Sequence, residues 1–346
     1  MKVFYSNFHL RHNPPFEVLD GGEKSPSFEI PDRVENIHSE LIHKPWAEFS
    51  ELHDFGLEPI LDVHDKGYVD FLRTAFQLWT AGDEKFEHVA LTPATFPPGG
   101  RRRIPHSVLG QAGYYMMDLS APIGVNTYLA AYHSAQCALS GAFALQEGNS
   151  VAYALCRPPG HHSGTANCGG YCYLNNAAIA ANRLAKIGSK VSILDIDYHA
   201  GNGTQEIFFE RNDVYTISIH ADPNEEYPYY WGYQDEVGHG PGYGFHRNYP
   251  LPIGTDDKGY LRTLDQACGL ITSFSPRYLV VSLGLDLASG DPLGKFHVSD
   301  DGIEKIGQRI NDLNLPTLIV QEGGYDIPRL GSRATIFLEN FAGKTP

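Results

Sequence analysis

The second half of the chain alternates between short, continuous apolar runs and segments with helical periodicity. The apolar runs predict buried strands at 151–156, 190–197, 214–220, 278–286 and 316–322. The segments between and after them predict helices at 175–188, 203–211, 261–274, 299–313 and 333–341. Because strands that are apolar along their whole length are buried on both faces, we expect a mostly parallel, multi-stranded sheet with helices on both sides. The predicted architecture is α/β, with residues 1–346 forming a single domain.

The first half of the chain is less regular. Residues 17–37 predict a loop that leads into a helix, and residues 64–79 have the period of an amphipathic helix. Residues 82–127 are dominated by Pro, Gly and charged residues, and no clean period survives there. Because a long irregular segment inside a compact domain usually has a function, we interpret 82–127 as a functional loop insert rather than a packed element.

The formal net charge of −15 narrows the classes of partner. Such a surface repels phosphate backbones, so we expect no nucleic-acid partner, and it would attract a small cation. An acidic surface that aids solubility, or that reflects a salty habitat, is the alternative. We find no signal peptide and no run of about 18 apolar residues, so we expect no membrane span and a cytoplasmic location. The five cysteines show no zinc or disulfide spacing and are interpreted as free thiols.

Polar residues alternate at the end of one predicted strand. Asp195, Asp197 and His199 share one face of that strand, and unpaired buried charge is costly, so these side chains need partners. A metal ion is one possible partner, and a satisfied hydrogen-bond network is the other. Asp286 ends a second strand and either caps a helix or completes an Asp-His-Asp set. Such a set suits zinc or another first-row divalent ion and leaves a position open for substrate, while Asp195 would orient a histidine or help hold a monovalent cation.

Two further segments contain candidate catalytic groups. His161 and His162 follow a strand and a Pro-Pro turn. They are either exposed loop residues or, beside a metal site, a general base and its neighbour. Tyr325 follows a strand and two glycines. It is either a packed aromatic residue or a hydrogen-bond donor to a developing oxyanion.

These elements, in this order, resemble the arginase–deacetylase superfamily and, within it, the zinc-dependent histone deacetylase family. The matching blocks are RPPGHHSGTANCGGYCYLNNAAIA, ILDIDYHAGNGTQEIF, VVSLGLD and VQEGGYD. Within that family the chain looks most like the bacterial acetylpolyamine amidohydrolases. Its length, the opening FYSNFHLRH, the segment GLEPILDVHDKGYVDFL and RIPHSVLGQAGYY in the insert all fit that branch. The resemblance therefore covers nearly the whole chain.

The resemblance implies a role for each matching residue. It implies that Asp197, His199 and Asp286 bind a catalytic Zn²⁺, for which Fe²⁺, Co²⁺ or Mn²⁺ could substitute. His162 matches the general base that activates the attacking water and then protonates the leaving amine, and His161 matches its electrostatic companion. Tyr325 matches the hydroxyl that polarises the scissile carbonyl, Asp195 the partner of His161, and Asn202 the partner of His162. The residues that match the substrate tunnel are Gly170, Tyr171 and Tyr227, and those that match a structural K⁺ site are Asp195, Asp197, His199, Ser218 and Ile219.

The sequence departs from the family pattern at two positions. Ala200 replaces a second histidine of many relatives but lies outside the ligand set. Leu109, which matches a position beside the substrate tunnel, replaces a glutamate that receives the distal ammonium in some relatives. This puts recognition of long polyamines in doubt, and Glu17 or Asp118 are the possible substitutes.

The function implied by the resemblance is the metal-dependent removal of acetyl groups from small cationic amines such as acetylpolyamines, acetylputrescine and acetylcadaverine. It also implies a homodimer whose 82–127 insert narrows the mouth of the tunnel. A protein-lysine deacetylase of the histone type is the main alternative, because it would share every catalytic residue. An arginase-like ureohydrolase would need more metal ligands, and an inactive binding protein for acetylated amines would be expected to have lost a ligand or the tyrosine.

Overall fold

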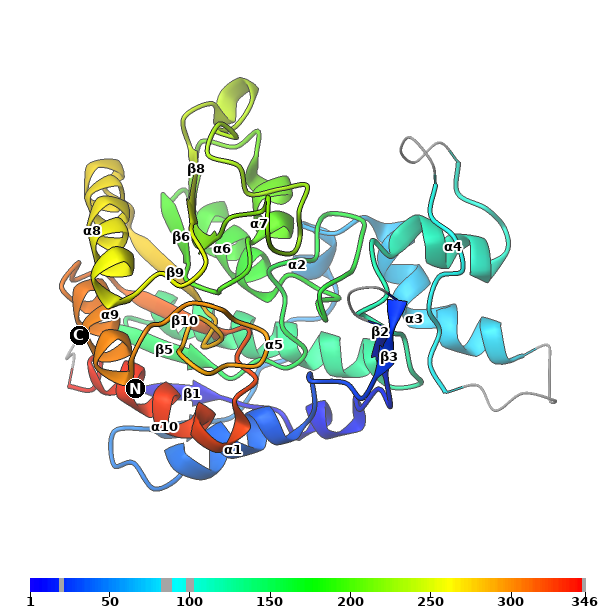
Figure 1. Ribbon diagram of the computed structural model, residues 1–346, viewed down its shortest axis with the longest axis horizontal. Helices are drawn as coiled ribbons and strands as arrows, with labels where there is room; N and C mark the ends of the chain where they lie inside the picture. Colours follow the sequence, from blue (N-terminus) through cyan, green and yellow to red (C-terminus); the bar gives the residue numbers. More distant parts are fainter. Residues whose placement is uncertain (19–21, 82–88, 98–102, 344–346) are drawn as a thin grey trace.

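The computed structural model of the chain describes residues 1–18, 22–81, 89–97 and 103–343. Within these residues the centre is a sheet of eight strands in the order β4-β1-β5-β10-β9-β6-β7-β8, and each neighbouring pair is parallel (Figure 1). The strands are β1 (Lys2–Phe4), β4 (Glu48–Ser50), β5 (Val151–Ala154), β6 (Val191–Asp195), β7 (Val214–Ala221), β8 (His246–Leu251), β9 (Tyr278–Leu283) and β10 (Thr317–Gln321). The predicted parallel α/β fold is confirmed.

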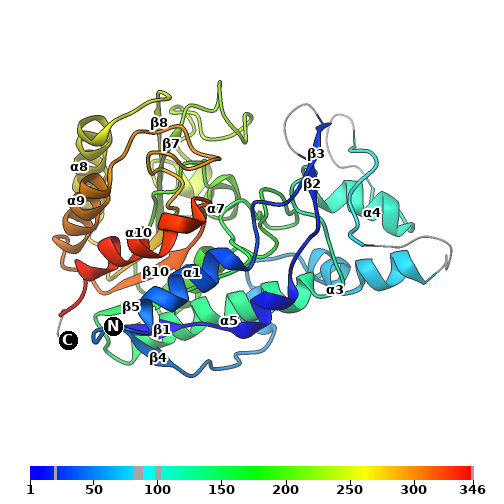
Figure 2. The same ribbon diagram turned by 60° about the horizontal axis from the view of Figure 1, so that its bottom comes forward.

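Helices cover both faces of this sheet. One face is covered by α5 (Thr127–Gln146), α6 (Asn176–Lys186) and the short α7 (Asn202–Phe208), and the other by α1 (Asp32–Leu41), α8 (Asp257–Phe274), α9 (Asp300–Asn311) and α10 (Ile327–Glu339) (Figures 1 and 2). Alternate strand residues serve the two faces: Ala152 and Ala154 pack on the α5 side, whereas Val151 and Tyr153 pack on the α10 side. This two-sided burial explains why the central strands are apolar along most of their length.

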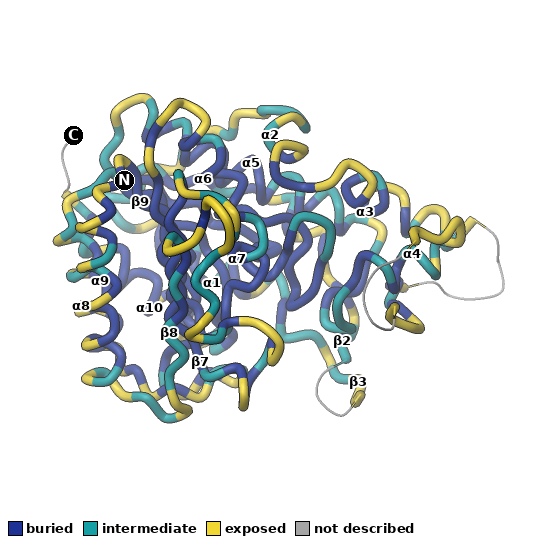
Figure 3. The backbone as a smooth tube through the Cα atoms, turned by 90° about the horizontal axis from the view of Figure 1, so that it is seen from above, coloured by how far each residue is buried: buried dark blue, intermediate teal, exposed yellow. Residues whose placement is uncertain are grey.

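The remaining elements lie beside the sheet rather than on it. They are the hairpin of β2 (Glu17–Val18) and β3 (Lys24–Ser25), α2 (Glu58–Leu61), α3 (Lys66–Thr80), α4 (Val108–Tyr115) and two 3-10 turns, Asn7–Arg11 and Gly240–Gly242. Figure 1 shows α3 and α4 together at one end of the molecule, with the β2–β3 hairpin next to them. Figure 3 shows that the buried backbone concentrates in the strands and the inner sides of the helices. Among the described residues, no helix combines the length and hydropathy needed to cross a bilayer.

The structure corrects the prediction that the 82–127 insert contains no packed element. Its described part contains α4, and Ala112, Tyr115 and Met116 are buried in the same core as Tyr68 and Phe71 of α3. The apolar positions of this eight-residue helix are too few to give a clear period, which explains why the sequence pattern missed it. Residues 82–88 and 98–102 of the insert lie outside the described residues.

Candidate active site

The predicted metal ligands converge at the carboxyl end of the sheet. Asp197 and His199 follow β6, and Asp286 follows β9, which is hydrogen-bonded beside it. His199 Nδ1 lies 3.2 Å from Asp197 Oδ1 and 3.1 Å from Asp286 Oδ2. Ligand-type atoms of all three residues lie within 4.8 Å of one another. Parallel strands that end at the same edge therefore bring together residues that are almost 90 positions apart in the sequence.

The backbone holds these carboxylates so that one oxygen of each remains directed at His199. Gly323 N donates to Asp197 Oδ2 at 2.9 Å, and Tyr198 N donates to Asp286 Oδ1 at 3.0 Å. Two carboxylate oxygens and one imidazole nitrogen form a donor set that zinc and other first-row divalent ions accept. Three protein ligands also leave a coordination position open, so the residues present fit a catalytic divalent metal.

Electrostatics also favour a cation between the two carboxylates. Burial and the neighbouring charge of Asp197 raise the pKa of Asp286 to about 7. Burial also opposes the charged form of Asp197, but His161 and His199 outweigh it and lower the pKa of that carboxyl. The carboxylates of Asp197 and Asp286, whose ligand atoms lie within 4.8 Å of one another, repel each other when both are charged. A positive charge between them relieves that repulsion.

His161 is held in its charged form by carboxylates. Its Nδ1 lies 3.0 Å from Asp195 Oδ2, the partner expected from the sequence, and its Nε2 lies 3.7 Å from Asp197 Oδ1. Burial disfavours the imidazolium, but Asp197 and Asp195 together outweigh burial and raise the pKa of His161 to about 10. The two carboxylates therefore favour the positively charged form of His161.

His162, the next residue, is held in its neutral form. Its Nδ1 lies 2.7 Å from Asn202 Oδ1, again the expected partner. An amide oxygen only accepts hydrogen bonds, so Nδ1 carries the proton and Nε2 is the unprotonated nitrogen. Burial, followed by the charges of His161 and His199, keeps the pKa of His162 well below its ordinary value. The arrangement places a histidine that favours its neutral form beside one that favours its charged form.

A pocket of about 430 Å³ opens over these groups. Its lining includes His162, His199, Tyr325 and the three predicted tunnel residues Gly170, Tyr171 and Tyr227. Gly170 is required at its position, because a Cβ there would meet the His162 ring at 2.3 Å and its φ is +52°. Tyr171 also adopts a left-handed φ of +66°, which is a strained conformation for a bulky residue. The chain turns sharply here, and the backbone of Gly170 lies directly against the His162 ring.

Asp118 braces this part of the wall, a role that the sequence did not reveal. Its Oδ2 accepts from Gly170 N at 2.8 Å and from the Tyr227 hydroxyl at 2.6 Å. Its Oδ1 accepts from both the backbone N–H and the hydroxyl of Ser120 at 2.9 Å. The carboxylate thus joins the insert to two tunnel residues that are distant in sequence.

Tyr325 is fixed from behind by two other residues that sequence reasoning missed. Asp291 Oδ2 accepts from Tyr325 N at 2.6 Å. Arg33 donates to the carbonyl oxygens of Gly324 and Glu322, each at 2.6 Å, and its guanidinium carbon lies 4.6 Å from the centre of the Tyr325 ring. Arg33 is almost 300 residues away in sequence, so no local pattern could have linked it to Tyr325.

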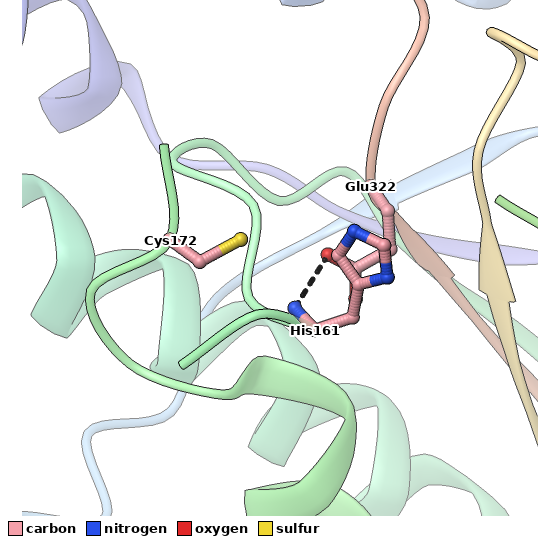
Figure 4. A group of neighbouring side chains, drawn as sticks. All are labelled: His161, Cys172 and Glu322. Atoms are coloured by element: carbon pink, nitrogen blue, oxygen red, sulfur yellow. Dashed lines mark hydrogen bonds between the residues drawn. The ribbon is translucent and has the colours of Figure 1, made fainter. Parts of the chain in front are cut away.

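A second group of possible ligands, His161, Cys172 and Glu322, lies behind the site (Figure 4). Glu322 Oε2 accepts from the backbone N–H groups of Gly160 and His161 at 2.6 and 3.2 Å. Burial raises the pKa of the Cys172 thiol well above its ordinary value and that of Glu322 to about 7. Metals bind the thiolate rather than the thiol, so this group is a poorer metal site than Asp197, His199 and Asp286.

The residues expected at a K⁺ site lie next to one another at the end of the sheet. Asp195 of β6 and Ser218 of β7 are paired in register, and Ile219 follows directly. Asp195, Asp197, Ser218 and Ile219 are buried, and His199 is partly buried.

The other residues considered for substrate recognition do not line the pocket within one copy of the chain. Leu109 lies on α4 with 48% of its surface exposed and is outside the pocket lining. Glu17 is buried, its Oε1 accepts from Phe28 N at 2.9 Å, and burial raises the pKa of its carboxyl.

Comparisons with known proteins agree with this geometry. Residues 27–341 match the family described as the histone deacetylase domain. The chain is 43% identical to acetylpolyamine amidohydrolase 1 of Pseudomonas aeruginosa, over 99% of both chains. It is 40% identical to the acetylpolyamine amidohydrolase of Mycoplana ramosa, over 99% of this chain and all of that protein. The crystal structure of an acetylpolyamine aminohydrolase from Burkholderia pseudomallei superposes with a TM-score of 0.94 at 39% identity, over 99% of both chains.

Proposed function

The chain belongs to the histone deacetylase family, and on that premise we propose that it removes acetyl groups from small N-acetylated amines, among them acetylpolyamines, acetylputrescine and acetylcadaverine. Family membership makes the protein a hydrolase that acts on amide bonds. The observation that carries the proposal is the pocket of about 430 Å³, whose lining includes His162 and His199. This volume is near the small end of the range for ligand pockets and suits an extended acetylated amine.

The family is metal-dependent, and the proposed ion is Zn²⁺ on Asp197, His199 and Asp286, with Fe²⁺, Co²⁺ or Mn²⁺ as substitutes. When bound, the ion would supply a Lewis acid beside the acetyl carbonyl and make the attacking water more acidic. A structural K⁺ is proposed for Asp195, Asp197, His199, Ser218 and Ile219. The in-register pairing of Asp195 with Ser218 supports that proposal.

The two histidines divide the proton chemistry between them. His162 Nε2 takes the proton from the attacking water and later gives it to the leaving amine. The hydrogen bond of Nδ1 to Asn202 supports this role, since it keeps Nε2 unprotonated before reaction. His161 remains charged beside Asp195 and provides fixed positive charge near the developing oxyanion.

Tyr325 donates a hydrogen bond from its hydroxyl to the acetyl carbonyl oxygen as negative charge develops there. Its place in the pocket lining supports this role, as do the contacts with Arg33 and Asp291 that hold it. A donor that is already fixed in place needs no reorganisation during the reaction, which is why such groups contribute strongly to catalysis.

The insert is proposed to form a homodimer that narrows the mouth of the pocket. Two apolar side chains in its described part support this, because Ile104 and Leu109 are 52% and 48% exposed. Tyr115 and Met116, at the end of α4, are buried within the chain and are not available to such an interface. Analytical ultracentrifugation should show a dimer, and a monomer would contradict this part of the proposal.

The test is a turnover assay with the zinc-loaded protein. Acetylputrescine, acetylcadaverine, acetylspermidine and an acetyl-lysine peptide from a histone are compared by kcat/KM. The small amines should be hydrolysed faster than the peptide. Faster hydrolysis of the peptide than of the small amines would favour the alternative, a protein-lysine deacetylase, which is consistent with the matched histone deacetylase domain.

A further inference from the structure

The charged groups of the pocket lining fall into two sets. Apart from the histidines of the active site, the described lining residues that carry full charge are Asp118, Glu226 and Lys295. Asp118 uses both oxygens to hold Ser120, Gly170 and Tyr227. It therefore serves the wall, and among the described lining residues Glu226 and Lys295 remain as the charged pair that could respond to a substrate.

Glu226 and Lys295 neutralise one another inside the pocket lining. Lys295 Nζ lies 2.5 Å from Glu226 Oε1. The two partners differ in exposure: the glutamate side chain is 10% exposed, whereas the lysine side chain is 60% exposed. A carboxylate that is largely withdrawn from water strongly favours a cation beside it, while a mostly exposed lysine loses little when it turns into solvent.

We propose that Glu226 is the acceptor for the distal ammonium of the substrate and that Lys295 is its resident competitor. This inference rests on the proposed function, since it names how the same pocket discriminates among acetylated amines. An incoming ammonium must replace Lys295 on Glu226. Lys295 then remains nearby as a positive charge, which repels each further ammonium that the substrate carries. The pair thereby sets a preference for short substrates of low charge.

The chemistry of the exchange is an ammonium-for-ammonium replacement without covalent change. The hydrogen-bonding capacity of the buried carboxylate is satisfied before and after binding, so the exchange avoids leaving Glu226 unpaired. The ammonium of the substrate therefore adds little affinity in the wild type, where it replaces Lys295. It should add much more affinity when Lys295 is removed. This distinguishes competition from a purely structural ion pair, for which loss of the lysine would only reduce stability.

The experiment measures kcat/KM for three zinc-supported reactions in the wild type, Lys295→Met and Glu226→Gln. The substrates are N-pentylacetamide, acetylcadaverine and N1-acetylspermidine, which carry zero, one and two ammonium groups beyond the amide. Methionine keeps an unbranched apolar stem without the charge. Lys305→Met on α9 is the matched control, because it removes one exposed positive charge far from the pocket.

In Lys295→Met, kcat/KM for acetylcadaverine divided by that for N-pentylacetamide should rise by about tenfold, the size expected for a partly desolvated charge pair. The same ratio for N1-acetylspermidine over N-pentylacetamide should rise by more. Glu226→Gln should lower both ratios, because Lys295 then repels ammonium groups without a carboxylate beside it. The double variant, which has neither charge, should bring both ratios close to one. Lys305→Met should leave the ratios unchanged. Ratios in Lys295→Met within twofold of the wild type would overturn the proposal.

A binding measurement separates this inference from the proposed function. Calorimetric titration with cadaverine, the deacetylated amine, requires no turnover. Lys295→Met should bind it about tenfold more tightly than the wild type, and Glu226→Gln should bind it more weakly. If no substrate is hydrolysed but these affinities change as stated, the proposed function fails and the ammonium site stands. Unchanged affinities would remove the ammonium site whatever the activity.

Discussion

Replacing Asp118 with asparagine tests whether this residue braces the pocket wall or binds the substrate's ammonium. The carboxylate accepts four hydrogen bonds, two on each oxygen, from Ser120, Gly170 and Tyr227. Asparagine keeps one oxygen and presents an NH₂ group on the other side. The Tyr227 and Ser120 hydroxyls can rotate to accept from it, but a backbone N–H cannot, so one amide, that of Gly170 or of Ser120, loses this acceptor in either orientation.

The expected cost is that of one hydrogen bond to a charged group, about 1.5–3 kcal/mol. The Asp118 carboxylate holds the strained Gly170–Tyr171 turn and Tyr227 in place. Most of the lost free energy should therefore appear as a less well-ordered tunnel wall. Since each 1.4 kcal/mol is about a factor of ten, kcat/KM should fall about 10- to 100-fold. The metal content should not change, because Asp118 touches none of the three ligand residues in the described contacts.

The assay compares acetylcadaverine with its uncharged analogue N-pentylacetamide. A bracing role predicts that both substrates lose activity equally, because both pass the same wall. Asp301→Asn on α9 removes one exposed negative charge far from the pocket and controls for the change in net charge. If Asp118→Asn impairs only acetylcadaverine, the carboxylate binds the ammonium and the bracing argument is refuted.

Four further predictions concern the metal, the catalysis, the pH dependence and the insert. Asp286→Ala should lose metal and activity together, since two remaining ligands hold zinc weakly; metal analysis that finds stoichiometric zinc in an active variant would contradict the ligand assignment. His162→Ala and Tyr325→Phe should keep the metal but lose about 10²–10⁴-fold and about 10²–10³-fold in kcat, and full activity in either would disprove its role. Burial lowers the pKa of His64 from its ordinary 6.5 to about 4, with one ring nitrogen donating to a backbone carbonyl and the other accepting from a backbone N–H. The stabilisation from this neutral histidine is complete above pH 6.5 and is lost as the pH falls toward 4. In urea unfolding, the advantage of the wild type over His64→Gln should therefore shrink by about 2 kcal/mol between pH 7.5 and pH 5, and a constant difference would contradict the pKa. Leu109→Glu should raise kcat/KM for acetylspermidine relative to acetylcadaverine, and an unchanged ratio would show that residue 109 does not face the substrate in the assembled protein.

The central strands and the metal-ligand cluster could be predicted because both depend on local pattern and one general rule. Strands buried on both faces are apolar throughout, and parallel strands end at one edge, so Asp197, His199 and Asp286 could be expected at the same edge of the sheet. The structure adds that their strands are neighbours, which brings the three side chains together. The strands β1 and β4 were missed because three residues give no period, and β8 because its HRNYPL sequence is polar and contains proline, which an edge strand tolerates. The long helix α5 was missed because it is apolar on nearly every side and therefore lacks an amphipathic stripe.

The supports of the site could not be predicted, because they are long-range contacts between residues of ordinary local sequence. Arg33 reads as one basic residue at the start of a helix, and only the fold shows it donating to the carbonyls around Gly323 and stacking on Tyr325. Asp118 reads as an acidic loop residue, and the sequence suggested an ammonium partner. The structure shows that it also joins two segments of the wall and lines the pocket.

The pKa values of the adjacent histidines depend only in part on the hydrogen-bond partners that the sequence predicts. A carboxylate partner favours imidazolium, so Asp195 predicts the direction of the shift at His161, whereas the neutral partner Asn202 does not account for the low pKa of His162. Burial has the same direction at both rings and would lower both pKa values, so it cannot distinguish them. The distinction arises because His161 contacts two carboxylates, and its charge then adds to burial in keeping His162 neutral. Replacing Asp195 with asparagine should therefore lower the pKa of His161 and weaken the repulsion that it exerts on His162. Nuclear magnetic resonance of the two imidazoles would test this, and an unchanged titration of His162 would show that the charge of His161 does not contribute to keeping it neutral.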